Sequence, residues 1–464
     1  MKNEGLAKYA FNALDRITDI YPPFGSRVFQ KIFLFILGSG KLHNYILHKY
    51  QKKLFATKDF NKILIVADVN IGDSINTQSG IEVMRALFPD SQIDYICNKT
   101  GGDVISNSPF VDNVFKIYRN SGLPLEEDAK KINKIVEEGG YSLILNLCPF
   151  LNKKILNCDA NVIHLYIVFV SYIIYLCKKN SSSLNLSLAT YTFFKNYFAP
   201  LLKSKIPNSA EIEKLYLNST YDGNKVYISD EAIEAAKNFL INNNLYQKGP
   251  LILFNLSVTI KFSMIPIELQ LQIIQNVILS EDITAVLIFK GKSTINIENM
   301  IIDRVPATHS GKIVAIPDTL TISEFTALID FCDMFVSGDT GTVHIAASRK
   351  ININSINSLK NRTALVSVFG ASDSRIYNYD SWKSGHSPAN QDVPSKVFVG
   401  EALCRNLTCI NRIVKTCKEV RCFLGLKAED ISSYIISYFK DLNINEAATQ
   451  KAKVYDNGSD NNTQ

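Results

Sequence analysis

Residues 62–67 read KILIVA, a continuous apolar run between two polar residues. Such a run is typical of a strand that is covered on both faces, as in a parallel sheet. Apolar side chains then recur at helical spacing over 74–88, and Pro89 ends the pattern. Further strands are predicted at 93–97, 114–117 and 142–147, with helices around Val104 and over 125–137. This alternation of strands and helices predicts a doubly wound, parallel sheet.

A second alternating series follows a predicted helix at 230–242 and a break at Gly249 and Pro250. Its predicted strands lie at 251–255, 285–289, 313–316, 334–337 and 365–369, and its helices at 267–279, 321–331 and 343–348. The predicted fold class is therefore α/β, with two doubly wound Rossmann-like domains that face a central cleft. The predicted divisions are an extension at 1–61, a first domain at 62–245, a second domain at 246–443 and a disordered tail at 444–464.

The composition supports two folded domains and excludes several classes of protein. A chain of 464 residues is long enough for two hydrophobic cores, and 46% hydrophobic residues exclude a largely disordered chain. A net charge of +6, spread over this length, is too small to indicate nucleic acid as the main ligand. Nine cysteines, an odd number, and the lack of a secretory leader predict reduced thiols in a cytoplasmic protein.

Four of the cysteines lie close together late in the chain, with the spacing C-x4-C-x7-C-x4-C. They are Cys404, Cys409, Cys417 and Cys422. The spacing lacks the paired C-x2-C knuckles of most structural zinc sites. An exposed surface is therefore favoured over a zinc site, and no metal is predicted.

Two segments bear on whether the protein contacts a membrane. Residues 25–58 contain no acidic side chain, and basic side chains alternate there with apolar ones, which predicts basic amphipathic helices. Peripheral attachment to anionic lipid at the inner membrane face and packing on the first domain explain this pattern equally well. The apolar run at 162–177 is too short to span a bilayer, so a buried element is favoured over an interfacial one.

The first candidate site follows the predicted strand at 62–67. Gly72 permits a tight turn there, and Asp73 comes just before the predicted helix. The turn lacks the G-x-G-x-x-G spacing of a nicotinamide-dinucleotide site. Asp73 has two interpretations: an N-cap of the helix, which the residue alone favours, or a general base that removes a proton from an acceptor hydroxyl.

The second candidate site lies in residues 335–348 (FVSGDTGTVHIAAS), where an apolar strand runs into a helix. The residues at the junction are Asp339, Thr340, Gly341, Thr342 and His344. Backbone N–H groups at a helix start, threonine hydroxyls and a glycine that permits close approach together suit a diphosphate. The alternative is an ordinary capped helix with a histidine that faces the core.

The third candidate site is the loop in residues 253–266 (LFNLSVTIKFSMIP), which carries Ser257, Thr259 and Lys261. Hydroxyls and a cation at the end of a strand could hold a leaving diphosphate as negative charge builds on it. The alternative is a solvated lysine on an ordinary surface loop.

Taken in order, these segments resemble the heptosyltransferase family of glycosyltransferases, glycosyltransferase family nine, over about residues 62–430. The Gly-Asp pair of IGDSINT and the Asp-Thr-Gly-x-x-His motif are its most recognisable features. The resemblance implies the GT-B fold and metal-independent, inverting transfer of a sugar from a nucleotide-diphosphate donor, usually ADP-heptose, to lipopolysaccharide core or a related envelope glycan. No cofactor is implied.

The resemblance also implies roles for the candidate residues. Asp73, beside Gly72, would be the catalytic base, and Asp339 would lie alongside the sugar or fix the loop. The residues that would hold the donor are Ser257, Lys261, Thr340, Gly341, Thr342 and His344. The implied partners are the nucleotide-sugar donor and a lipid-linked or polysaccharide acceptor.

Two alternatives to this function stay open from the sequence. One is a nucleotide-sugar epimerase of similar architecture, which would need no acceptor and would release a free sugar. The other is a catalytically silent family member that binds a nucleotide-sugar or acts as a scaffold. An enzyme that works at the cytoplasmic face of the membrane is the favoured interpretation.

Overall fold

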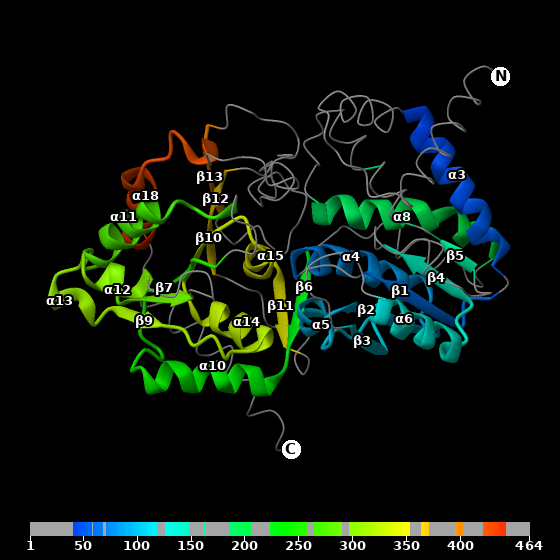
Figure 1. Cartoon of the computed structure of the whole chain (residues 1–464), viewed down its shortest axis with the longest axis horizontal. Coiled ribbons are helices and arrows are strands. Elements are labelled where there is room, and N and C mark those ends of the chain that lie inside the picture. Colours follow the sequence, from blue (N-terminus) through cyan, green and yellow to red (C-terminus); the bar gives the residue numbers. More distant parts are fainter. Residues whose placement is uncertain are drawn as a thin grey trace. The chain divides into compact units, whose positions relative to one another are not determined.

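The computed structural model divides the chain into two compact units, residues 1–221 and 222–464, and each is described here by itself (Figure 1). It describes residues 40–57, 59–67, 71–117, 126–147, 161–163, 165, 172, 186–205, 223–257, 263–289, 297–352, 363–370, 395–401 and 421–441. The division precedes strand β6 (Lys225–Ile228) and helix α10 (Asp230–Asn242), whereas the predicted domain boundary follows both.

The first unit is built on a five-stranded sheet in which every neighbouring pair is parallel. Its order is β3-β2-β1-β4-β5, from β3 (Asn113–Ile117), β2 (Gln92–Asn98), β1 (Lys62–Val66), β4 (Leu143–Asn146) and β5 (Asn161–Ile163). Its helices are α3 (Gly40–Ala56), α4 (Ile71–Leu87), α5 (Lys99–Ile105), α6 (Glu126–Gly139) and α8 (Leu186–Lys205). The chain order reverses between β1 and β4, which makes this a doubly wound sheet.

The second unit has a six-stranded parallel sheet of order β13-β12-β10-β7-β8-β9. The strands are β7 (Leu251–Asn255), β8 (Ala285–Phe289), β9 (Ile313–Ala315), β10 (Met334–Gly338), β12 (Ala364–Phe369) and β13 (Ser395–Val399). The helices besides α10 are α11 (Ile267–Ile278), α12 (Ile297–Ile302), α13 (Ala307–Ser310), α14 (Ile322–Phe331), α15 (Gly341–Ala347) and α18 (Ala428–Asp441). Strand β6 pairs separately with β11 (Arg349–Asn352), and the main order reverses between β7 and β10.

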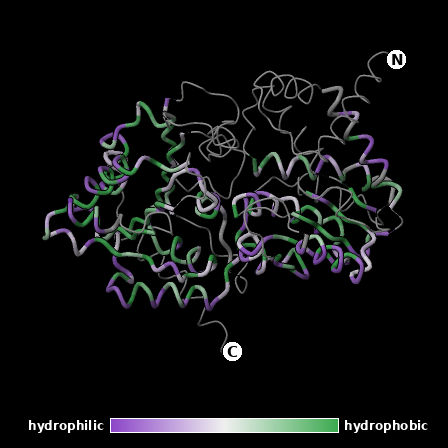
Figure 2. The backbone as a smooth tube through the Cα atoms, viewed as in Figure 1, coloured by the Kyte–Doolittle hydropathy of each residue, from purple (hydrophilic) through white to green (hydrophobic). Residues whose placement is uncertain are grey.

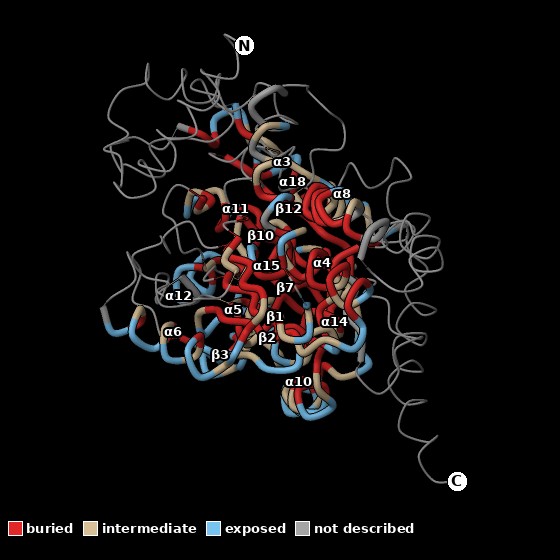
Figure 3. Tube along the Cα trace, turned by 90° about the vertical axis from the view of Figure 1, so that its right-hand side faces the viewer, coloured by how far each residue is buried: buried red, intermediate tan, exposed pale blue. Residues whose placement is uncertain are grey.

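The apolar strands are buried because both faces of each sheet are covered. In β1, Ile63 and Ile65 belong to one hydrophobic cluster of the first unit, and Leu64 and Val66 to another. Since neighbouring side chains of a strand point to opposite faces, a strand with two covered faces needs a continuous apolar run. Figure 3 shows this burial along the chain, whereas α10, on the surface, carries both hydrophilic and hydrophobic residues (Figure 2).

The predicted fold class is confirmed: both units are α/β with parallel, doubly wound sheets. The predicted strands at 251–255 and 285–289 have the observed bounds, as does the predicted helix at 230–242. The helix predicted to start at residue 74 instead starts at Ile71, because Gly72 lies inside its first turn rather than in a tight turn before it. Strands β5, β6, β11 and β13 and helices α3, α8 and α18 complete the units.

Helix α3 shows which contacts residues 40–56 make within the first unit. Tyr50 and Leu54 are buried in the core of the first unit, and Gln51 Nε2 donates a hydrogen bond of 3.1 Å to the backbone oxygen of Tyr197 in α8. The apolar side of α3 therefore packs on the first unit, as the second of the two interpretations requires. Residues 25–39 lie outside the described part of the chain, and so does most of 162–177, although Ile163 and Leu165 are buried.

None of the helices in the described ranges is both long and apolar enough to cross a bilayer. The polar residues predicted as a disordered tail, 444–464, lie outside those ranges.

Candidate functional site

The second unit gathers polar side chains at the point where its strand order reverses. In open α/β sheets, ligands bind beyond the carboxyl ends of the strands at this switch point. The two strands that flank it are β7 and β10. Asn255 is the last residue of β7, Ser337 lies next to the last residue of β10, and Thr340 and Thr342 follow β10 directly. We call these four residues the hydroxyl cluster.

Hydrogen bonds from one amide connect the hydroxyl cluster. The Nδ2 atom of Asn255 lies 2.7 Å from the hydroxyl oxygen of Thr342, 3.0 Å from that of Ser337 and 3.2 Å from that of Thr340. The two threonine hydroxyls lie 2.6 Å apart. Asn255 is 3% exposed, whereas Thr340 is partly exposed. The cluster therefore runs from a buried residue, Asn255, to a partly exposed one, Thr340.

The loop that follows β7 is fixed at both ends. At its start the backbone N–H of Ser257 donates to Oδ1 of Asn255 over 3.0 Å. At its end the hydroxyl of Ser263 donates to Oδ2 of Asp339 over 3.1 Å. Between them, Thr259 and Lys261 lie outside the described residues.

Gly338 is needed for this close approach. A Cβ atom at Gly338 would lie 2.8 Å from the backbone oxygen of Ser263, which is too close for any real contact. The end of β10 and the Ser263 segment can therefore meet only because residue 338 has no side chain. A role of Asp339 in fixing the loop requires a contact with that loop, and the hydrogen bond from Ser263 is such a contact. Both this role and a position of Asp339 alongside the sugar stay predictions.

His344 lies in α15 and is buried. Burial lowers the pKa of His344 to about 4, although the carboxylate of Asp339 acts in the opposite direction. The imidazole is therefore uncharged at neutral pH. It would meet a diphosphate as a hydrogen-bonding group and not as a cation.

In the first unit, Asp73 is exposed and lies after β1, one of the two strands that flank that sheet's switch point. It is the third residue of α4 and lies in the first turn, so it is not the N-cap residue itself. Its neighbour Gly72 is buried. Burial raises the pKa of Tyr95, and the charge of Asp73 adds to this effect. The role of Asp73 as a base stays a prediction.

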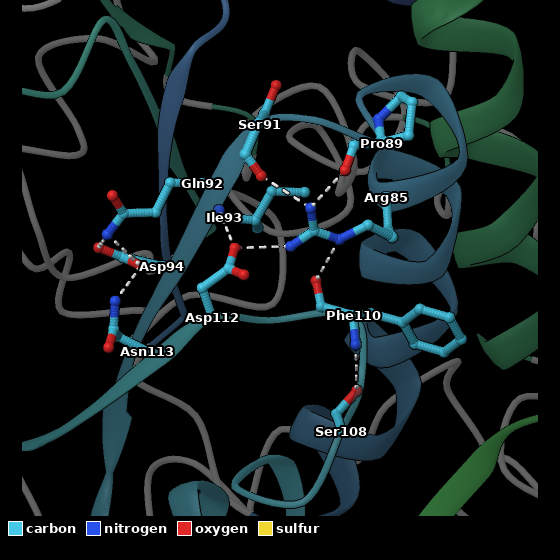
Figure 4. A network of polar contacts seen from close by, with 10 residues as sticks. All are labelled: Arg85, Pro89, Ser91, Gln92, Ile93, Asp94, Ser108, Phe110, Asp112 and Asn113. Atoms are coloured by element: carbon cyan, nitrogen blue, oxygen red, sulfur yellow. Dashed lines mark hydrogen bonds and ion pairs between the residues drawn. The ribbon is translucent and has the colours of Figure 1, made fainter.

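The helix that carries Asp73 is fixed near its other end (Figure 4). The Arg85 guanidinium donates to the backbone oxygens of Ser91 (2.7 Å), Pro89 (3.1 Å) and Phe110 (3.4 Å) and to Oδ2 of Asp112 (2.6 Å). Asp112 also accepts from the backbone N–H of a β2 residue, so one carboxylate ties α4 to the sheet. Asp73 therefore stands on a helix whose position relative to the sheet is well defined.

Asn255, Ser337 and Ser263 were not among the predicted site residues. For Asn255, its position in the sequence could have identified it. It is the polar last residue of the apolar strand LILFN, and this strand pairs with β10, which leads to the predicted motif. Three of their hydrogen bonds join residues that lie 82, 87 and 76 positions apart in sequence.

No metal centre is visible in the described ranges, where no group of three or more histidine, cysteine, aspartate or glutamate side chains could hold an ion. Of the four late cysteines, Cys422 is buried, and Cys404, Cys409 and Cys417 lie outside those ranges.

Comparison with known proteins agrees with this architecture. Residues 225–354, which contain the hydroxyl cluster, match the family model for glycosyltransferase family 9 (heptosyltransferase). A family 9 glycosyltransferase from Veillonella parvula is similar in structure with a TM-score of 0.55 and 13% identity, over 83% of this chain and 98% of that one. A search of curated proteins found no significant match.

Two Escherichia coli structures show weaker similarity, below a TM-score of 0.5. ADP-heptose LPS heptosyltransferase II has a TM-score of 0.49 and 14% identity, over 82% of this chain and 98% of that one. Heptosyltransferase WaaC with ADP has a TM-score of 0.46 and 11% identity, over 81% of this chain and 99% of that one. The fold comparison rests on the Veillonella protein alone.

The similarity to the Veillonella protein and the parallel, doubly wound sheet of each unit confirm the predicted fold class. The family model confirms, over residues 225–354, the predicted resemblance to the heptosyltransferase family, glycosyltransferase family nine.

Proposed function

We propose that the protein transfers a sugar from a nucleoside-diphosphate donor to a hydroxyl of an envelope glycan. The family resemblance favours ADP-heptose as the donor and lipopolysaccharide core or a related glycan as the acceptor. The observation that carries the proposal is the hydroxyl cluster, which lies at the switch point of the second sheet and inside the region that matches the family model.

In the proposed reaction, Asp73 removes the proton of the acceptor hydroxyl while the hydroxyl oxygen bonds to the anomeric carbon of the donor sugar. The bond from that carbon to the diphosphate breaks, and the leaving nucleoside diphosphate takes the electron pair. A single displacement inverts the configuration of the anomeric carbon. Hydrogen bonds from the hydroxyl cluster, with Ser257 and Lys261 of the adjoining loop, would stabilise the charge that builds on the diphosphate.

A ligand panel tests the donor class. Thermal unfolding would be followed with ADP-, GDP-, UDP- and CDP-sugars, because a ligand that binds only the folded state raises the melting temperature. We expect a concentration-dependent rise with a nucleotide-sugar and the largest rise with ADP-heptose. If none of the four raises the melting temperature at millimolar concentration, the proposed donor site is wrong.

Asp73→Asn tests the base. The variant should bind the donor like the wild type, and its transfer rate should fall by about 10²–10⁴, the usual contribution of a general base. Asp90→Asn is the matched control, because Asp90 is exposed just beyond the other end of α4 and the change in charge is the same. Equal transfer rates in all three proteins would remove Asp73 from the mechanism. Release of free sugar without an acceptor would indicate the epimerase-like alternative.

We also propose that attachment to anionic lipid at the inner membrane face uses electrostatic attraction by the exposed side of α3. Lys52 lies on that side, whereas the apolar side is buried. Each basic residue near such a surface contributes about 1 kcal/mol. Flotation with anionic liposomes should therefore recover less Lys52→Glu than wild type, and equal recovery would refute this attachment.

A further inference from the structure

The orientation of the Asn255 amide follows from its partners. A backbone N–H can only donate a hydrogen bond, so the side-chain atom that faces the N–H of Ser257 must be the oxygen. The nitrogen end, with two protons, therefore faces the hydroxyls of Ser337, Thr340 and Thr342. Asn255 acts only as a donor toward the three hydroxyls of the cluster.

The proton of Ser337 is used inside the protein. Its hydroxyl donates to the backbone oxygen of Gly338 over 3.0 Å, and a carbonyl oxygen can only accept. Ser337 therefore accepts from Asn255 and contributes no donor to a ligand.

The two threonines hold two hydroxyl protons and need only one of them for each other. One proton lies in the 2.6 Å hydrogen bond between Thr340 and Thr342. Asn255 donates at 2.7 Å to Thr342, its shortest contact, and a hydroxyl that accepts one hydrogen bond can still donate its own proton, so Thr342 can be the donor to Thr340. The proton of Thr340 is then left with only the 3.3 Å contact to Ser337 among the described residues. Thr340 is the accessible member, so this proton can point outward.

We propose that Asn255 is a positioning residue that keeps this chain of hydrogen bonds directed outward, from Asn255 to Thr342 to Thr340 to the ligand. Such a chain directs a donor at the ligand, and each bond polarises the next. It therefore favours a strong acceptor, such as the ionised oxygens of a diphosphate, over a neutral sugar hydroxyl, which accepts more weakly. This inference rests on the proposed function and adds the residue that sets the polarity of its donor site.

Asn255→Asp reverses the polarity with almost no change in shape. A carboxylate is an acceptor, so it would draw the threonine protons inward. We expect affinity for ADP, and for inorganic pyrophosphate as a probe without a base or sugar, to fall at least about tenfold, the effect of losing one hydrogen bond to a charged group. Asn276→Asp is the matched control, because Asn276 also donates to a serine hydroxyl in the same unit, between α11 and α18. It should bind both probes like the wild type.

A double-variant cycle separates proton direction from simple charge repulsion. Thr340→Val removes the outward donor, and Thr340→Ser should restore it. If Asn255→Asp acts through that hydroxyl, adding it to Thr340→Val costs little further affinity. If it acts only by repelling the anion, the two losses multiply, and the proposal is wrong.

Asn255→Leu tests the same idea if the aspartate variant does not fold. Leucine neither donates nor accepts, so the threonine protons lose the group that directs them, and pyrophosphate affinity should fall, by no more than in Thr340→Val. Wild-type affinity in Asn255→Leu or in Asn255→Asp would overturn the proposal, and so would a loss in Asn255→Leu larger than in Thr340→Val, which would assign Asn255 a structural role only. A wild type that binds neither ADP nor pyrophosphate would instead refute the proposed function itself.

Discussion

Acidification tests the environment of the buried His344 side chain. Its pKa is 6.5 in an ordinary setting and is lowered by burial to about 4, with Asp339 acting in the opposite direction. Because the folded pKa lies below the unfolded one, the unfolded chain takes up a proton first as the pH falls. His344 thus contributes stability fully above pH 6.5, and this contribution is lost as the pH falls from about 6.5 to about 4.

The size of the effect follows from the two pKa values. Each pKa unit corresponds to about 1.4 kcal/mol, so a shift from 6.5 to about 4 sets an upper limit of about 3 kcal/mol. At pH 5 the linkage relation gives a loss of about 2 kcal/mol in the free energy of unfolding from this one group.

Urea unfolding at pH 8 and pH 5 measures this loss. The wild type should lose about 2 kcal/mol more between these conditions than His344→Gln, which cannot take up the proton. His309→Gln is the matched control for the loss of a histidine, because His309 is partly exposed in the same unit. If His344→Gln and wild type lose the same free energy, His344 is not buried as described.

Three further changes test the packing of the two units. Leu54→Ala should lower the free energy of unfolding by about 2–5 kcal/mol in urea, because Leu54 is 1% exposed in the first core; unchanged stability with weaker liposome binding would instead place α3 on lipid. Arg85→Met removes four hydrogen bonds and should cost about 2–3 kcal/mol by the same assay, and a loss below about 0.5 kcal/mol would show that α4 is held by other contacts. Gly338→Ala forces the Ser263 segment away and should cost about 1–3 kcal/mol and weaken ADP binding in a titration, and a variant with unchanged stability and binding would contradict the close approach.

Much of the fold follows from local patterns in the sequence. LILFN at β7 and AVLIF at β8 are apolar throughout because both of their faces are covered, and the same reason makes them easy to predict. Strands β6 and β11 were missed for the opposite reason. KVYI and RKIN mix polar with apolar residues. Among the described residues they pair with each other alone, and about half of the second unit's sequence separates them. A local sequence pattern does not indicate that two distant segments pair.

The candidate site divides in the same way. Thr340 and Thr342 were predicted because a strand, a glycine and hydroxyls follow one another within a few residues. Asn255 was not, because its importance depends on hydrogen bonds to residues that the sheet order brings beside it. The start of α4 was predicted three residues late, since a glycine at the second position of a helix looks like a turn in sequence alone.

The two serine contacts that bound the loop after β7 have a practical consequence for engineering. Ser257 is held by Asn255 and Ser263 by Asp339, so neither partner belongs to the intervening residues 258–262. The four of these positions other than Lys261 can therefore be randomised as a cassette while both flanking attachments are kept. A library of this kind, screened with different nucleotide-sugars, would vary donor preference without altering the framework that holds the segment.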